Sequence, residues 1–132
     1  MRLQRLLVPG LFVVLGFVSS ADAVEPTKDS LDVVKRGIAE KKAVLLDVRE
    51  KDEWDHGHLK DAVNLPLSAI EKGTTSDDLE KIAGKETIIY LHCAAGARSL
   101  EAAKRLANTG RDLRSLKPGY RDLVKAGFPR VN

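Results

Sequence analysis

The chain has 132 residues, enough for one domain, with 22 basic and 19 acidic side chains and a net charge of +3. Charges of both signs are mixed along the sequence, which argues against a nucleic-acid partner. The single cysteine excludes an intramolecular disulfide, so the core must fold without one.

Residues 1–23 have the pattern of a secretory signal peptide. Two arginines and no acidic residue precede an apolar run at 6–18, and an A-x-A cleavage pattern ends at Ala23. The run is shorter than the roughly 20 residues that a membrane span needs. We therefore expect cleavage after Ala23, export to the periplasm without stable membrane association afterwards, and one domain over residues 24–132. An uncleaved membrane anchor is the alternative.

Helix and strand patterns alternate along the rest of the chain. Leu31 and Val34 share one face of a first helix, which Thr27 or Asp29 is expected to cap. The near-continuous apolar run 43–48 is typical of a strand buried on both faces of a parallel sheet. In order, the patterns predict a helix ending near Glu40, a strand at 43–48, a helical turn at 49–54, a strand at 62–65, a turn at 68–72, a helix at 77–83, a strand at 87–91, a helix at 99–108, a strand at 113–116 and a helix at 120–126.

This alternation predicts an α/β fold with a mostly parallel central sheet flanked by helices. Ligands of such sheets bind beyond the carboxyl ends of the strands, and Cys93 lies at one of these ends. Four small residues, Arg98 and a helical pattern follow it. Backbone N–H groups of this loop can converge on one point, where a helix N-terminus and an arginine favour a thiolate. A buried structural cysteine is the alternative.

Several polar residues near the expected site have structural explanations. Asp47 ends a buried strand, so its charge must be paired. Arg49 and Glu53 are four residues apart and are expected to pair on a short helix. His56 and His58 are too few ligands for a metal site, and we expect them to bind backbone groups.

Three segments, taken in order, resemble the rhodanese-like domain family. Residues 47–66 contain D-V-R, E-W, G-H-L and A-V-N-L-P and resemble its opening segment. Residues 93–99, C-A-A-G-A-R-S, resemble the active-site loop of single-domain rhodaneses, and residues 116–129 resemble the closing segment. This closing segment departs from the family pattern, with Pro118 in place of a glycine and Leu123 in place of a tryptophan.

The resemblance implies sulfur transfer without a metal or organic cofactor. Cys93 would take a sulfane sulfur from thiosulfate or a similar small anion, hold it as a persulfide and pass it to cyanide or a thiol. Backbone N–H groups of the loop would stabilise the donor oxygens and the persulfide sulfur. Ser99 is expected to be the helix N-cap. The candidate site is the catalytic Cys93 with the substrate-binding residues Ala94, Ala95, Gly96, Ala97 and Arg98.

Three questions stay open at this point. Arg98 either binds donor oxygens or braces the loop, and we favour contact with substrate. His92 either tunes Cys93 or makes a buried hydrogen bond. The same scaffold also serves cysteine-dependent phosphatases, arsenate-type reductases and non-catalytic binding modules. The His92-Cys93 pair favours a phosphatase, whereas a Cys-x4-Arg loop one residue shorter than theirs opposes it.

Overall fold

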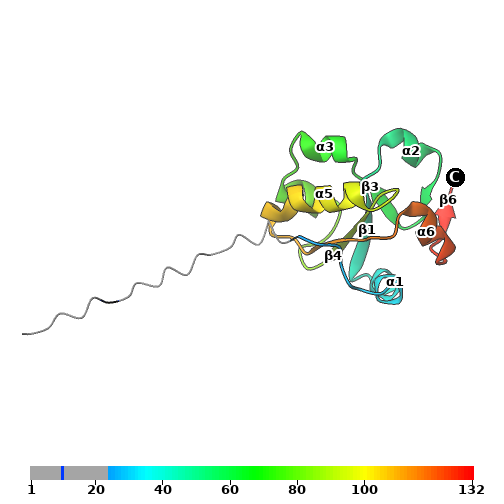
Figure 1. Cartoon of the computed structure of the whole chain (residues 1–132), viewed down its shortest axis with the longest axis horizontal. Coiled ribbons are helices and arrows are strands. Elements are labelled where there is room, and N and C mark those ends of the chain that lie inside the picture. Colours follow the sequence, from blue (N-terminus) through cyan, green and yellow to red (C-terminus); the bar gives the residue numbers. More distant parts are fainter. Residues whose placement is uncertain (1–9, 11–23) are drawn as a thin grey trace, which may run out of the picture.

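The computed structural model describes Gly10 and residues 24–132, so the expected signal peptide lies outside the described part of the chain. Within that part, no helix is long and apolar enough to cross a membrane. Helices and strands alternate as the sequence predicts (Figure 1). They are α1 (Leu31–Ala39), β1 (Ala43–Asp47), α2 (Lys51–Asp55), β2 (His58–Leu59), β3 (Ala62–Asn64), α3 (Leu67–Glu71), α4 (Ser76–Glu80), β4 (Ile88–His92), α5 (Ala97–Leu106), the 3-10 helix η2 (Ala107–Thr109), β5 (Leu113–Ser115), α6 (Tyr120–Lys125) and β6 (Arg130–Val131).

The central sheet has four parallel strands in the order β3-β1-β4-β5, which confirms the α/β prediction. The chain runs outward from β1 to β3 and later from β4 to β5 on the other side. Its direction of winding therefore changes between β1 and β4, and a crevice at the carboxyl ends of these two strands is the expected ligand site of such a sheet. Asp47 and His92 are paired at that point in the register.

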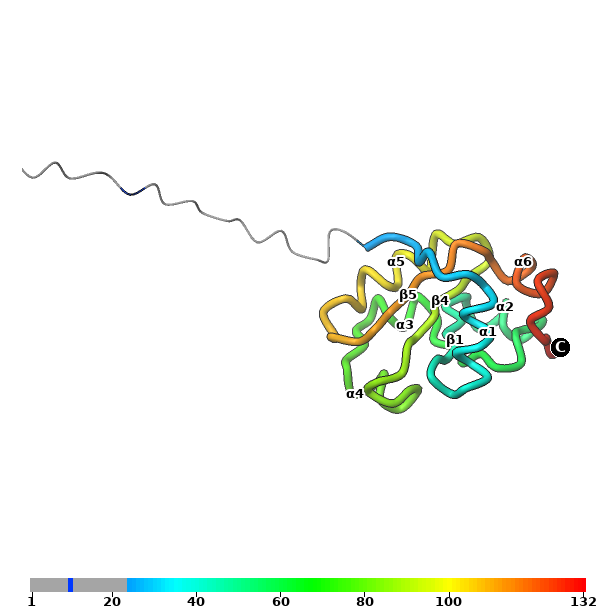
Figure 2. Tube along the Cα trace, turned by 90° about the horizontal axis from the view of Figure 1, so that it is seen from below, coloured from blue at the N-terminus to red at the C-terminus, as the bar shows by residue number. Residues whose placement is uncertain are grey.

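Strand alternation builds two cores, one on each face of the sheet. Leu46 and Leu91 face the core formed with α3, α4 and α5, whereas Leu45 and Tyr90 face the core formed with α1 and α6. Figure 1 shows α3 and α5 on one side of the sheet and α1 on the other, and Figure 2 shows α4 and α6 at opposite ends of the molecule. Both faces of the sheet are thus covered, as its apolar strands require.

Local details differ from the sequence expectations. Ser30, rather than Thr27 or Asp29, caps α1, because its side chain accepts a hydrogen bond from the N–H of Val33. The short antiparallel pair of β2 and β6 was not expected, since two-residue strands have no readable periodicity. It holds the C-terminal segment beside the loop that follows α2.

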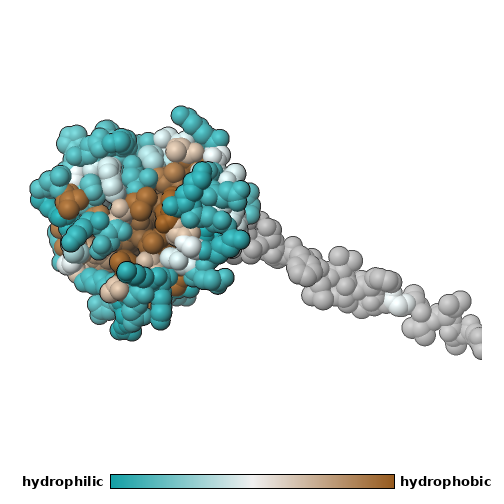
Figure 3. Space-filling view, turned by 180° about the vertical axis from the view of Figure 1, so that it is seen from behind, coloured by the Kyte–Doolittle hydropathy of each residue, from teal (hydrophilic) through white to brown (hydrophobic). Residues whose placement is uncertain are grey.

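The surface is mostly hydrophilic. Figure 3 shows apolar residues gathered near the centre of one face and surrounded by hydrophilic ones. Among the described residues, the exposed large hydrophobic ones are Val33, Val63 and Val131, and none is more than 43% exposed. Single exposed hydrophobic residues of this kind are ordinary on soluble domains.

Candidate active site

Cys93 follows β4 directly, and its sulfur is surrounded by hydrogen-bond donors. The backbone N–H groups of Gly96 and Ser99 point to Sγ at N···S distances of 3.0 Å and 3.4 Å. The Ser99 hydroxyl oxygen lies 3.5 Å from the same sulfur. The residue as a whole is only 1% exposed. A sulfur held by several N–H donors is the arrangement expected to stabilise a thiolate.

These contacts lower the pKa of the Cys93 thiol. Burial raises the pKa, but the hydrogen bond between Sγ and the Ser99 hydroxyl oxygen and the hydrogen bonds from the backbone of Ser99, Ala95 and Gly96 together outweigh burial. The net shift is below the ordinary value, so a larger fraction of the thiol is ionised near neutral pH than in a free cysteine.

Ser99 does not cap the helix as expected. α5 begins at Ala97, Gly96 occupies the N-cap position, and Ser99 lies inside the first turn with no exposed surface. Its hydroxyl donates to the carbonyl oxygen of Gly96 at 3.0 Å and stays beside the sulfur. The N-cap expectation for Ser99 is wrong, because the helix begins two residues earlier than predicted, and the side chain contacts the sulfur instead.

Gly96 is a residue that the loop conformation requires. Its φ of 94° is left-handed, and a Cβ there would lie 2.7 Å from the carbonyl oxygen of Lys117. Glycine alone meets both conditions without strain. This turn is what directs the Gly96 N–H at Sγ.

The closing segment packs directly on residues 94–98, the loop that follows Cys93. A Cβ on Gly119 would lie 1.7 Å from the carbonyl oxygen of Ala94, and the N–H of Tyr120 donates to the carbonyl oxygen of Cys93 at 2.8 Å. Pro118, which stands where the family pattern has a glycine, is therefore compatible with close packing of its neighbour Gly119 against the loop. Leu123, which stands where the family pattern has a tryptophan, is fully buried in the core that α6 helps to form.

Arg98 is turned toward α2. Its guanidinium forms a two-pronged ion pair with Glu53, with N···O distances of 2.6 Å and 2.8 Å. This pair lowers the pKa of Glu53 to about 2, with the hydrogen bond from Arg98 as the main cause. The predicted pairing of Arg49 with Glu53 is wrong, because Arg98 from α5 binds Glu53 instead. The four-residue spacing that suggested the pairing takes no account of residues that are distant in the sequence. In this geometry Arg98 connects the loop after Cys93 to α2.

Arg49 binds Asp47 instead. Three N–H groups of the Arg49 side chain and backbone reach the Asp47 carboxylate, among them Nη2 at 2.8 Å from Oδ2. The guanidinium also donates to the carbonyl oxygen of Gly57 at 2.8 Å and lies 4.2 Å from the ring centre of Tyr120. Both charges are almost fully buried, so this pair joins the end of β1 to the loop after α2.

His92 is fully buried, and neither of its ring nitrogens has a hydrogen-bond partner within the described part of the chain. The expected buried hydrogen bond is therefore absent there. Strand alternation directs His92 away from Cys93, toward Asp47, whose Oδ2 lies 4.0 Å from Nε2. Burial lowers the pKa of His92 to about 4, so the ring is neutral at neutral pH.

The other two histidines bind backbone groups, as predicted. Nδ1 of His56 lies 2.6 Å from the carbonyl oxygen of Asp52, and Nδ1 of His58 lies 3.1 Å from that of Trp54. The rings of His58 and Trp54 stack at 3.6 Å. Across residues 24–132, no group of histidine, cysteine and acidic side chains is arranged to hold a metal ion.

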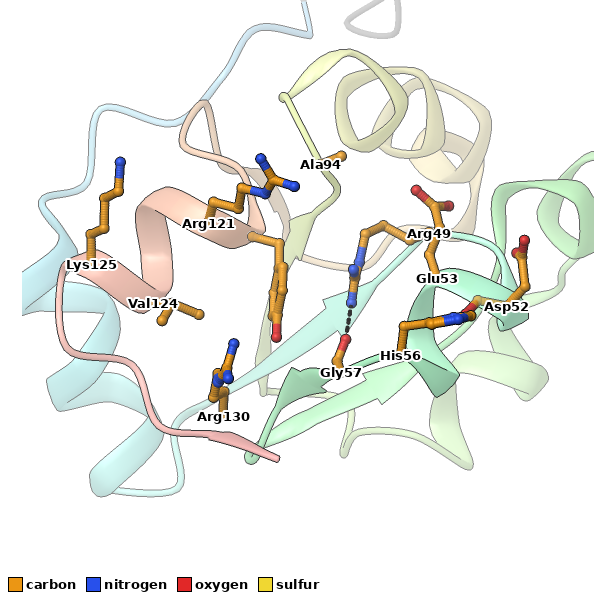
Figure 4. A pocket seen from close by; sticks show the side chains of 11 residues that line it. Arg49, Asp52, Glu53, His56, Gly57, Ala94, Arg121, Val124, Lys125 and Arg130 are labelled. Carbon is orange, nitrogen blue, oxygen red and sulfur yellow. Dashed lines mark hydrogen bonds between the residues drawn. The ribbon is translucent and has the colours of Figure 1, made fainter. Parts of the chain in front are cut away.

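A groove of about 820 Å³ lies beside the loop that follows Cys93, and Ala94 is one of its lining residues. Figure 4 shows α6 and β6 on one side of it, with Arg121, Lys125 and Arg130, and α2 on the other, with Asp52 and Glu53. Arg49 and Gly57 lie between the two sides. Sequence reasoning missed the residues of α6 and β6, although the four-residue spacing of Arg121 and Lys125 does place them on one helix face.

The expected loop residues are thus brought together around the sulfur, but they do different things. Gly96 donates to Sγ, Ala94 lines the groove, and Arg98 contacts Glu53. Ala95 and Ala97 have exposed side chains that leave the backbone accessible.

Comparison with known proteins places this geometry in a family. The sequence model of the Rhodanese-like domain matches residues 30–126. The chain is 35% identical over 83 residues to the putative mitochondrial thiosulfate sulfurtransferase of Schizosaccharomyces pombe, covering 58% of each chain. It is 35% identical over 83 residues to the adenylyltransferase and sulfurtransferase uba4 of Ogataea parapolymorpha, covering 63% of this chain and 20% of uba4. The chain therefore spans less than two thirds of the length of either relative.

Solved structures agree on the fold. A rhodanese-related protein of Thermoplasma volcanium has a TM-score of 0.61 and 26% identity over 76% of this chain and 92% of its own. Together with the matched sequence model, which covers most of the described residues, this likeness leads to one conclusion. The chain belongs to the rhodanese-like domain family.

Proposed function

We propose that this protein is a sulfurtransferase that carries a sulfane sulfur on Cys93 as a persulfide, with thiosulfate or a similar anion as donor. The observation that supports this most is the pair of backbone N–H groups, from Gly96 and Ser99, directed at Sγ. These donors favour a negative sulfur, which is the form of both the attacking thiolate and the persulfide. Membership of the rhodanese-like family supports the same chemistry.

The proposed reaction has two displacement steps. The Cys93 thiolate attacks the outer sulfur of thiosulfate, a sulfur–sulfur bond forms to Sγ, and sulfite leaves with the electron pair of the bond that breaks. An acceptor, cyanide or a thiolate, then attacks the terminal sulfur, and the Cys93 thiolate leaves. The products are thiocyanate or an acceptor persulfide, and the enzyme returns to its starting state without an external oxidant or reductant.

Access to the sulfur is part of the proposal. Because Cys93 is 1% exposed, the donor reaches it only when the loop next to Ala94 opens toward the groove. Small side chains at positions 94, 95 and 97 leave little bulk to displace in that opening. The same burial supports a second candidate function, a binding module in which Cys93 is structural.

Thiocyanate production from thiosulfate and cyanide tests the proposal and separates the two candidates. The sulfurtransferase account predicts turnover in the wild-type protein and its loss in Cys93→Ser and Cys93→Ala. Hydrolysis of an aryl phosphate, measured on the same samples, is expected to be absent, because Arg98 is engaged by Glu53. Failure of every sulfane donor, with the folded thiol also resistant to alkylation, would favour the binding module.

We also propose that residues 1–23 direct export to the periplasm and are removed. The test is N-terminal sequencing of the protein from the periplasmic fraction of a bacterium expressing the full chain. Val24 as the first residue supports the proposal, and an intact Met1 or retention in the cytoplasm would overturn it.

A further inference from the structure

The groove beside the catalytic loop has an excess of positive charge that its own neighbours do not neutralise. Arg121, Lys125 and Arg130 line it, and none of them makes an ion pair or side-chain hydrogen bond with any residue of the described chain. We call these three residues the basic wall. It comes from α6 and β6, on the opposite side of the groove from α2 (Figure 4).

The other charges around the groove largely cancel. Arg49 is bound by Asp47, and Glu53 is bound by Arg98. Asp52 is the one acidic lining residue whose carboxylate has no partner within residues 24–132. Three unmatched cations against one unmatched carboxylate leave the groove positive. Charges that line a groove concentrate ligands of the opposite sign.

The size of the groove fits a molecule larger than the inorganic reactants. Its volume of about 820 Å³ is within the range of organic-ligand sites. One water occupies about 30 Å³ of liquid volume, so cyanide or thiosulfate would fill only a small fraction of the groove. Ala94, which directly follows the nucleophile in the chain, is one of the lining residues, so a molecule bound in the groove lies beside the loop that holds the sulfur.

We propose that the groove selects the sulfur acceptor, and that the acceptor is an organic thiol carrying carboxylate groups. This inference rests on the proposed function. The carboxylate binds the basic wall, and the thiolate of the acceptor attacks the terminal sulfur of the Cys93 persulfide. A bond forms between the two sulfurs, the bond to Sγ breaks, and Cys93 leaves as a thiolate.

The test measures the acceptor step by itself. Wild-type protein is loaded with thiosulfate, freed of excess donor, and checked by intact mass for the added sulfur. It is then mixed with 3-mercaptopropionate, 2-mercaptoethanol or cysteamine, which are similar in size and negative, neutral and positive, respectively. Rates are compared per concentration of thiolate. We expect the anionic thiol to react about tenfold faster than the neutral one, with the cationic thiol slowest, and high salt to reduce the difference.

Two matched triple variants locate the effect. The groove variant carries Arg121→Gln, Lys125→Gln and Arg130→Gln together. It should bring the rates of the three thiols to within about twofold of one another. The control variant removes the same charge from three exposed lysines that do not line the groove, and it should keep the wild-type preference. Its substitutions are Lys72→Gln, Lys85→Gln and Lys104→Gln.

The outcomes separate the inference from the function beneath it. A loaded wild-type protein that reacts equally with all three thiols, or a preference that survives in the groove variant, overturns the acceptor proposal and leaves sulfur transfer intact. If both triple variants lose the preference for the anionic thiol equally, the overall charge of the protein causes it, and this result also overturns the proposal. A protein that takes up no sulfur overturns the proposed function itself.

Discussion

Two arginine–carboxylate pairs flank the groove, and they differ mainly in burial. The Asp47–Arg49 side chains are 0% and 6% exposed, whereas those of Glu53 and Arg98 are both 34% exposed. Each guanidinium binds its carboxylate through two of its N–H groups, with the shortest N···O distances at 2.8 Å and 2.6 Å. Two pairs of the same chemistry can thus have very different energetic roles.

The difference teaches where each pair acts. A buried charge that loses its partner is left without water, so Asp47 and Arg49 hold the fold at the end of β1. A half-exposed pair gains little stability, since water competes for both partners. Its effect is to hold the start of α5 against α2, and therefore to position the loop that surrounds Cys93.

Breaking the buried pair has the largest expected effect. Asp47→Asn leaves the Arg49 guanidinium buried without a counter-charge, and we expect a loss of about 3–5 kcal/mol in the free energy of unfolding. Urea denaturation measures this loss. Asp55→Asn, which removes the exposed partner of Lys51, is the control and should change stability by less than about 1 kcal/mol. Equal effects of the two substitutions would contradict the comparison.

Acid provides a second way to perturb the buried region. Burial lowers the pKa of His92 from 6.5 to about 4. The nearby Asp47 carboxylate raises this pKa and the Arg49 guanidinium lowers it, but both effects are smaller than that of burial. Between these two values the unfolded chain binds a proton that the folded chain does not, so stability falls as pH drops from about 6.5 to about 4, by up to about 3 kcal/mol.

The variant His92→Leu isolates this effect. It removes the titrating ring and two ring nitrogens that lack hydrogen-bond partners in the described structure, so we expect little loss of stability at pH 7. The difference in unfolding free energy between wild type and variant should change across the pH range given above. A difference that stays constant from pH 7 to pH 4 would show that His92 does not titrate as its burial requires.

Breaking the half-exposed pair should cost little stability and more activity. Arg98→Gln and Glu53→Gln are each expected to change the unfolding free energy by about 1 kcal/mol or less and to lower sulfur-transfer turnover several-fold. If Arg98 acts through Glu53, the double variant loses no more turnover than either single variant. A large loss in Arg98→Gln with none in Glu53→Gln would instead assign Arg98 to substrate binding.

The smallest effect is expected at Ser99. Ser99→Ala removes the hydroxyl 3.5 Å from Sγ but keeps the backbone N–H that also lowers the pKa of the thiol. The pKa of Cys93 should therefore rise, and alkylation by iodoacetamide at pH 7 should slow by a few-fold. The pH profile of alkylation measures this change, and a profile identical to that of wild type would remove Ser99 from the account.

The sequence carries enough information for the fold because β1 and β4, at the centre of the sheet, are apolar runs and α1 and α5 have periodic apolar faces. It also identifies Cys93 and the small-residue loop, since a lone cysteine between a strand and a helix is a local pattern. Ser99 and Arg98 are harder to predict. Their roles depend on where α5 begins and on Glu53, which is 45 residues away from Arg98 in the chain.

The basic wall shows the same limit. Arg121, Lys125 and Arg130 look like ordinary surface charges in a chain where both signs are common. The pairing of β6 with β2 and the packing of Gly119 and Tyr120 on the loop after Cys93 bring these charges to the groove. Contacts between residues distant in sequence therefore decide which of many similar charges line the groove.

Intact mass spectrometry of the protein before and after thiosulfate tests the central claim most directly. The account predicts that the wild-type protein gains one sulfur atom, that cyanide removes it, and that Cys93→Ser gains none. A wild-type protein that gains no sulfur from thiosulfate or any other sulfane donor, or a Cys93→Ser variant that gains as much as wild type, would contradict the account.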